Sequence, residues 1–170
     1  MKLADTKYDN SETGCCARLD AARWDGQRHE WQHKRFLKDH VRSLFHIPLN
    51  YGAVMTRSQA AIERAAAYPE EPIWLTDEVS LWGADVYFAT DRDVPGASMA
   101  ELSGTFITKV FDGPFSQIGK WNAEMRTFVA AKGETLEKIY YFYATCPECA
   151  RRFGKNQVVL FGKITAPTAN

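Results

Sequence analysis

The residues best suited to metal or thiol chemistry are four cysteines, which occur as the close pairs Cys15-Cys16 and Cys146-Cys149. Thiolates at such spacing bind zinc or exchange disulfides. A closed zinc site needs four ligands, so the first pair could complete a set with the second. Zinc is therefore the one cofactor that the sequence indicates. Thiol-redox chemistry and two ordinary reduced pairs are the alternatives.

General acid or base chemistry needs carboxylates or histidines near a bound ligand. The candidates are Glu78, Glu124 and His46, and Lys109 could orient an anionic ligand group. His46 stands directly before Ile47-Pro48, where proline ends any helix and side chains often face a cleft. All four histidines of the chain, at positions 29, 33, 40 and 46, fall in this one stretch.

Aromatic residues make up 13% of the chain and gather in its β-rich segments. Trp82, Phe111, Tyr141 and Tyr143 are the candidates for lining a pocket that binds an apolar or cationic ligand. Because side chains alternate along a strand, Tyr141 and Tyr143 should share one face. We therefore expect a small-molecule ligand, bound by these rings in a cleft between two modules.

Charge and hydropathy exclude other partners. Twenty-one Lys and Arg residues against 21 Asp and Glu give a net charge of +0, so the basic surface typical of nucleic-acid binding is missing. No apolar run approaches the ~18 residues of a membrane helix, and the polar start lacks the apolar core of a secretory signal. The sequence thus indicates a soluble, cytoplasmic protein with neither nucleic acid nor membrane as partner.

The expected elements begin with a polar arm, residues 1–24, followed by a single α+β domain over 25–170. An N-terminal amphipathic helix is predicted over 27–45 from apolar residues at helical spacing. Two β-α-β-β modules should follow, at about 49–90 and 104–164. Their expected strands are 50–55, 72–76, 81–90, 104–111, 138–145 and 157–164, and their helices are 60–67 and 114–132.

The second module is the better defined of the two. Pro114 suits the first turn of its helix, Trp121 and Met125 belong to the apolar face, and Gly133 suits the left-handed position past its end. The duplicated β-α-β-β order predicts a mostly antiparallel sheet with the helices on one face. Cys146 should then open a short helical turn that ends near Gly154.

This order resembles the gyrase-inhibitor-like small-molecule-binding superfamily over residues 49–164. The chain is more closely similar to small bacterial proteins labelled as hydrolases. The phrases that carry the second resemblance include Trp31-x-x-Lys34-x-Phe36, Thr108-Lys109-Val110-Phe111-Asp112-Gly113-Pro114-Phe115, Lys120-Trp121 and Thr145-Cys146-Pro147-x-Cys149.

The resemblance implies binding of amphipathic or cationic organic molecules between the modules, with hydrolysis by a carboxylate beside aromatic residues in some members. That carboxylate is expected near Tyr141 and Tyr143, but the predicted strand 138–145 contains neither Asp nor Glu. Our first interpretation is a small-molecule-binding protein, whose reaction, if it is an enzyme, is hydrolysis of an amphipathic or aromatic compound. The alternatives are a noncatalytic ligand sensor or binding module, and a zinc-linked or thiol-redox protein.

Overall fold

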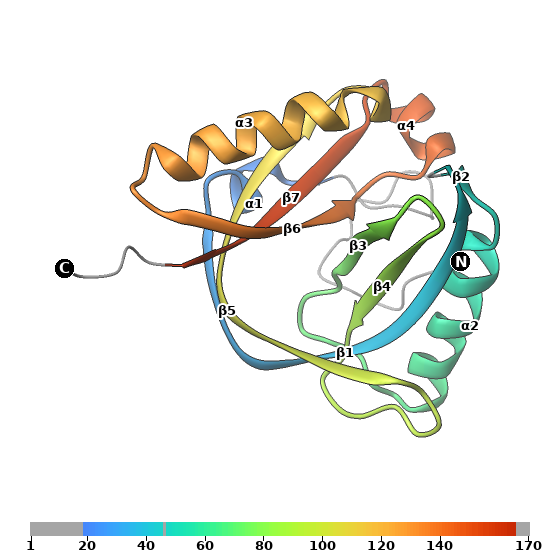
Figure 1. The fold of residues 1–170 in the computed structure, drawn as a ribbon. Helices are drawn as coiled ribbons and strands as arrows, with labels where there is room; N and C mark the ends of the chain where they lie inside the picture. Colours follow the sequence, from blue (N-terminus) through green and yellow to red (C-terminus); the bar gives the residue numbers. More distant parts are fainter. Residues whose placement is uncertain (1–18, 46, 166–170) are drawn as a thin grey trace. The chain divides into compact units, whose positions relative to one another are not determined.

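The computed structural model describes residues 19–45 and 47–165. The chain divides into two compact units (Figure 1). Unit 1 comprises the described residues up to Trp31 and from Gly104 onward, and unit 2 comprises Gln32–Ser103. Two long strands, β1 (Arg28–Leu44) and β5 (Met99–Asp112), contribute residues to both units.

Unit 1 combines an antiparallel set of strands in the order β6-β7-β5 with one long helix. The pairing of β7 with β5 places Phe161 opposite Thr108, and its pairing with β6 places Phe161 opposite Tyr140. Its elements besides β1 and β5 are α1 (Ala21–Trp24), η1 (Phe115–Gln117), α3 (Ile118–Ala130), β6 (Thr135–Tyr143), α4 (Pro147–Phe153) and β7 (Gln157–Thr165).

The helix α3 covers one face of the unit 1 strands (Figure 1). Trp121, Met125 and Val129 recur at every fourth position, so they form one stripe that is buried against the strands. The predicted helix 114–132 is thereby confirmed in position, although its first turn is a 3-10 helix. Gly133 has a φ of +74°, as expected of a residue that ends a helix.

Aromatic side chains fill the other face of the unit 1 strands. The Trp24 ring lies 6.0 Å from Phe142 and 5.6 Å from Phe161, and the Phe106 ring lies 6.2 Å from Tyr140. All five side chains are buried. Residue 24 closes the predicted arm, yet the Trp24 carbonyl accepts a hydrogen bond from the Thr108 hydroxyl of β5. We call these five residues the aromatic layer.

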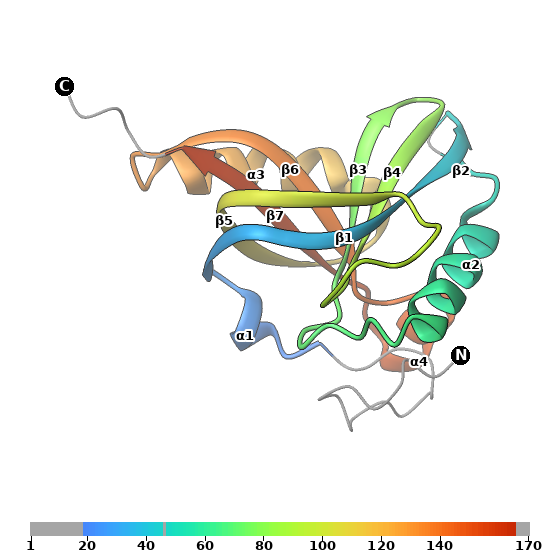
Figure 2. The same ribbon diagram turned by 90° about the horizontal axis from the view of Figure 1, so that it is seen from below.

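Unit 2 has the strand order β2-β1-β4-β3, and each of its strand pairs is antiparallel. Its helix α2 lies along β1 (Figure 2) and packs Val54 and Ile62 against the apolar side chains of the strands. Its elements besides β1 and β5 are β2 (Ile47–Pro48), α2 (Tyr51–Arg64), β3 (Trp74–Ser80) and β4 (Gly83–Ala89).

The predicted N-terminal helix 27–45 is wrong, because β1 occupies this segment. Phe36 and Leu37 point to opposite faces of β1 and are both buried, as in a strand covered on both faces. Most residues of the segment are charged or polar with good helix propensity, and tertiary pairing overrides that preference. Residues 36–42 pair with β4 along their whole length.

The predicted strand 50–55 is also wrong, since these residues begin α2 rather than precede it. Tyr51, Val54, Met55, Ser58 and Ile62 follow the helical repeat, and the apparent capping box at 56–59 lies inside the helix. The remaining predicted strands are present with shifted ends. The short helix after Cys146 is confirmed, and Gly154 ends it with a φ of +72°.

The α+β class and the antiparallel pairing are as predicted. In unit 2, β4 pairs with both β1 and β3, and α2 lies between β1 and β3 in the sequence. In unit 1, β7 pairs with both β5 and β6, and α3 lies between β5 and β6 in the sequence. An approximate twofold relation between the two sets stays a prediction. No helix in the described residues is both long and apolar enough to cross a membrane.

Candidate functional site

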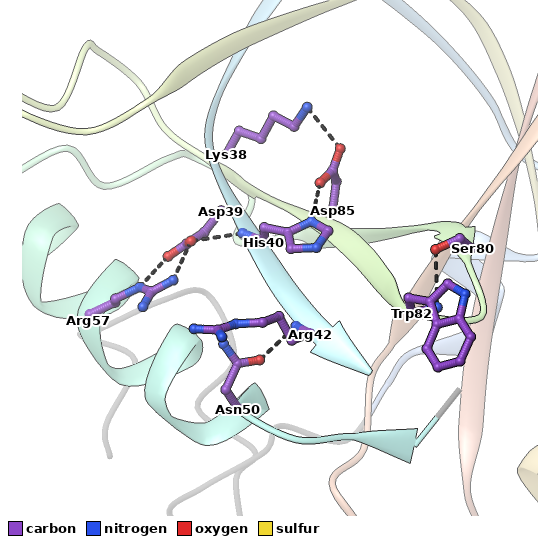
Figure 3. Close-up of polar contacts among 9 residues, drawn as sticks. All are labelled: Lys38, Asp39, His40, Arg42, Asn50, Arg57, Ser80, Trp82 and Asp85. Carbon is purple, nitrogen blue, oxygen red and sulfur yellow. Dashed lines mark hydrogen bonds and ion pairs between the residues drawn. The ribbon is translucent and has the colours of Figure 1, made fainter. Parts of the chain in front are cut away.

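The face of unit 2 opposite α2 carries ionisable side chains beside the buried rings of Phe36 and Tyr87. Leu37 and Val41 point to the helix, so the alternating residues Lys38 and His40 lie on the other side of β1. The register places His40 directly opposite Asp85 of β4. These three residues form the polar cluster drawn in Figure 3.

Asp85 joins the cluster through both carboxylate oxygens. Its Oδ1 lies 2.8 Å from His40 Nδ1, and its Oδ2 lies 2.8 Å from Lys38 Nζ. Burial favours a raised pKa for this carboxyl, but the hydrogen bonds from Lys38 and His40 outweigh burial and hold its pKa below the ordinary value. The hydrogen bond to Asp85 in turn raises the pKa of Lys38. Asp85 is therefore ionised at neutral pH.

An ionised carboxylate only accepts hydrogen bonds, so it selects the imidazole form that carries a proton on Nδ1. The neutral His40 ring then has its lone pair on Nε2, the atom that takes a proton in general base catalysis. The His40 side chain is 54% exposed, whereas that of Asp85 is 20% exposed. A partly buried carboxylate thus orients a half-exposed imidazole ring.

Gly83 makes room for this histidine. A Cβ atom at Gly83 would lie 2.5 Å from His40 Nε2 and 2.7 Å from Cε1, closer than real Cβ contacts approach. The imidazole edge therefore rests directly on the backbone of β4 (Figure 3). Asp85 and Gly83 together fix both the tautomer and the position of the ring.

A second carboxylate anchors β1 to α2 beside the cluster. Asp39 accepts hydrogen bonds from Arg57 Nε at 2.6 Å, from Arg57 Nη2 at 2.5 Å and from the Ser58 hydroxyl at 3.2 Å. The Arg57 hydrogen bond is the largest cause that lowers the pKa of Asp39. This pair holds the strand that carries His40, and it does not itself reach the base.

Trp82 is exposed at the turn between β3 and β4, next in sequence to Gly83. Its carbonyl accepts a 2.8 Å hydrogen bond from the Ser43 amide of β1, and its ring lies 5.4 Å from that of Phe45. Of the ligand-binding residues expected from the sequence, Trp82 is therefore the one that lies beside the polar cluster.

The other expected ligand-binding residues lie in unit 1. Phe111 stacks on Trp121 at 5.7 Å, and the Tyr141 hydroxyl donates to Asn122 Oδ1 at 2.9 Å, so both residues lie on the face that α3 covers. Tyr141 and Tyr143 stack at 6.1 Å, which confirms that they share a face. Lys109 lies over the Phe111 ring. A role of these residues in ligand binding stays a prediction.

The three acid–base residues expected from the sequence do not form one group in the described residues. Glu78 is exposed on β3, and Glu124 is exposed on α3, where its carboxylate lies 3.8 Å from Lys120 Nζ. His46 lies outside the described residues. Catalysis by any of the three stays a prediction.

The cysteine site can be followed only in part. Cys15 and Cys16 lie outside the described residues. Cys146 caps α4, where its sulfur accepts a hydrogen bond from the Cys149 amide at 3.4 Å, and Cys149 is buried. In the part of the chain that the structure describes, no three His, Cys, Asp or Glu side chains form a group suited to a metal ion.

Sequence reasoning missed His40 and Asp85. The two residues are 45 positions apart, and the helix expected over 27–45 gave His40 no neighbour on another strand. A strand in that segment, with Leu37 and Val41 inward and Lys38 and His40 outward, would have suggested an ionisable face. The partner of His40 becomes apparent only from the β1–β4 register.

The fold and this site define an α+β protein with a half-exposed histidine that is oriented by a carboxylate. The chain belongs to the family described as Bacterial hydrolase, whose profile matches residues 6–164. No curated protein matches it significantly.

Several solved structures are similar in fold. A hydrolase from Listeria innocua is 14% identical, with a TM-score of 0.60 and coverage of 83% of this chain and 92% of that chain. An uncharacterized conserved protein from Listeria innocua is 15% identical with the same TM-score and the same coverage. The EcmrR C-terminal domain is 9% identical, with a TM-score of 0.53 and coverage of 84% and 98%. At these identities the likeness concerns the fold alone.

Proposed function

We propose that the protein is a hydrolase for an amphipathic or aromatic organic compound and that His40 is its general base. The observation that carries the proposal is the 2.8 Å contact of His40 Nδ1 with Asp85 on an exposed face. Membership of the hydrolase family supports the reaction class. The substrate's polar group would bind at the polar cluster of Lys38, His40 and Asp85.

The chemistry requires no group beyond water. For an ester, His40 Nε2 takes a proton from water as the water oxygen bonds to the carbonyl carbon. The ester C–O bond then breaks, and the leaving oxygen takes the proton back from His40. Asp85 stabilises the imidazolium formed between these two steps, as a buried carboxylate does in other hydrolases.

The test is turnover of 4-nitrophenyl and 1-naphthyl esters by variants of this pair. We expect His40→Gln to lower kcat/KM by about 10²-fold or more, because general base catalysis is lost. Asp85→Asn should also lower it, since an amide can present its N–H to Nδ1 and select the wrong tautomer.

His33→Gln is a matched control. His33 is on the same strand, and its Nδ1 lies 2.8 Å from Glu101 Oε2, but this pair is more exposed. The control should retain wild-type turnover. Equal losses in the His33 and His40 variants would contradict the proposal. Binding of these esters by the wild type without turnover would instead favour the noncatalytic binding module.

A further inference from the structure

Large apolar side chains are exposed at one end of unit 2, in two segments far apart in the sequence. One segment comprises the end of β1 and the start of the α2 connection, and the other is the β3–β4 turn. These side chains are Leu44, Phe45, Leu49, Leu81 and Trp82, which we call the apolar tip.

A backbone hydrogen bond joins the two segments of the apolar tip: the Ser43 amide donates to the Trp82 carbonyl at 2.8 Å. Within the first segment, the Leu49 amide donates to the Arg42 carbonyl at 2.8 Å. Figures 1 and 2 both show the β3–β4 turn beside the end of β1. The two segments therefore lie side by side.

Phe45 adopts a conformation that its own packing does not explain. Its φ is +49°, and Leu44 pairs with Ile47 across the hairpin that it enters. Tight hairpins need positive φ, which Gly, Asn or Asp normally supplies. Phe45 adopts it with a ring that is 64% exposed and touches Trp82. Backbone strain of this kind is concentrated at functional sites.

The apolar tip is continuous with the polar cluster. Trp82 precedes Gly83, whose backbone supports the His40 ring, and Gly83 pairs with Arg42, two residues beyond His40 on β1. A molecule with an ester at His40 Nε2 would therefore extend its apolar part over Trp82 and Phe45. Burial of both partners' apolar surfaces favours such binding.

We propose that the apolar tip binds the acyl or aryl part of the substrate, so that the substrate class is neutral esters of medium-chain or aromatic acids. This inference rests on the proposed function of His40. It adds a specificity determinant, because an ester without an apolar acid part would leave Trp82 and Phe45 uncovered.

The experiment compares 4-nitrophenyl acetate with 4-nitrophenyl hexanoate. In the wild type, kcat/KM should rise roughly ten-fold from acetate to hexanoate, since each methylene group that is partly buried adds binding. Phe45→Ser and Trp82→Ser should each reduce this ratio toward one. Phe115→Ser, which removes an exposed ring from unit 1, is the matched control and should keep the ratio.

The outcomes separate the two proposals. A flat chain-length profile in the wild type, with turnover that still depends on His40, would overturn the role of the tip and leave the proposed function intact. An equal loss of the ratio in Phe115→Ser would also overturn it. If no ester is hydrolysed, the proposed function fails, and calorimetric titration with the non-hydrolysable octyl 4-nitrophenyl ether then tests the tip alone. The role of the apolar tip would be overturned if the wild type did not bind this ether, or if Phe45→Ser bound it as tightly as the wild type.

Discussion

Units 1 and 2 each pack one long helix on one face of three paired strands, but they use the opposite face of those strands differently. In unit 1 that face bears the aromatic layer of Trp24, Phe106, Tyr140, Phe142 and Phe161, all of them buried. In unit 2 that face bears the buried rings of Phe36 and Tyr87 and, further along β1 and β4, the polar cluster, where the His40 side chain is 54% exposed.

One face contributes stability through packed rings, and the other leaves a hydrogen-bonded histidine exposed. Close-packed rings gain free energy from burial and tolerate little change. An accessible histidine gains little by burial, and its position depends on the two groups that flank it, Asp85 and Gly83. Substitutions should therefore affect stability in unit 1 and activity in unit 2.

The largest expected effect is in the aromatic layer. Phe161→Ala should lower the free energy of unfolding by about 3–5 kcal/mol, because it removes a buried ring and leaves a cavity. Urea denaturation gives this value. His40→Ala, measured in the same way, should cost much less. Comparable losses for the two variants would break the contrast between the units.

Gly83→Ala should have the next largest effect, about 1–3 kcal/mol, because the new methyl group overlaps the His40 ring. It should also lower ester turnover, since the His40 ring must move away from its position against residue 83. The new Cβ atom would also lie 2.9 Å from the Val41 carbonyl oxygen of β1, so the double variant Gly83→Ala/His40→Ala should recover only part of the lost stability, and no turnover. A double variant as unstable as Gly83→Ala would show that the backbone contact, rather than the ring, causes the loss.

The Asp39–Arg57 pair gives a smaller, pH-dependent effect. The pKa of Asp39 is lowered in the folded state, so its stabilisation is present above its unfolded pKa and is lost as the pH falls through the folded value. Because the Arg57 side chain is 56% exposed, solvent screening keeps this stabilisation small. Asp39→Asn should therefore lower stability at pH 7, with a difference that shrinks below about pH 4. Urea midpoints across that range are the measurement, and a constant difference would contradict the assignment.

The smallest effect is expected on the exposed surface of α3. Glu124→Gln removes an ion pair with Lys120 one helical turn away and should change stability by about 0.3 kcal/mol. Thermal unfolding in low and high salt checks this value, because salt should abolish the difference. A loss above about 1 kcal/mol would indicate a further interaction of this carboxylate.

The secondary structure of unit 1 was predicted better than that of unit 2, because the local sequence signals of unit 1 agree with its fold. The helix α3 combines Pro114, an apolar stripe and Gly133, so every local signal agrees with the fold. The strand β1 has few β-branched residues, and its apolar side chains happen to fall at helical spacing. Its pairing with β4 and β5 decides its structure, and such long-range pairing cannot be read from a single segment.

In the candidate site, too, local patterns predicted some features, and long-range pairing decided the others. The shared face of Tyr141 and Tyr143 followed from strand alternation. That Tyr141 packs beneath α3, while its neighbours Tyr140 and Phe142 join the aromatic layer, depends on which face the helix covers. The His40–Asp85 contact depends on register between strands 45 residues apart, which no local pattern encodes.

The strands β1 and β5 restrict how this chain could exchange segments by recombination. Unit 2 is a continuous segment inserted into unit 1, but its boundaries, after Trp31 and after Ser103, fall inside these two strands. Excising or exchanging unit 2 at its boundaries would therefore cut two strands in mid-course and leave their ladder partners unpaired. Exchange of unit 2 as an intact module would therefore require new ends for both strands.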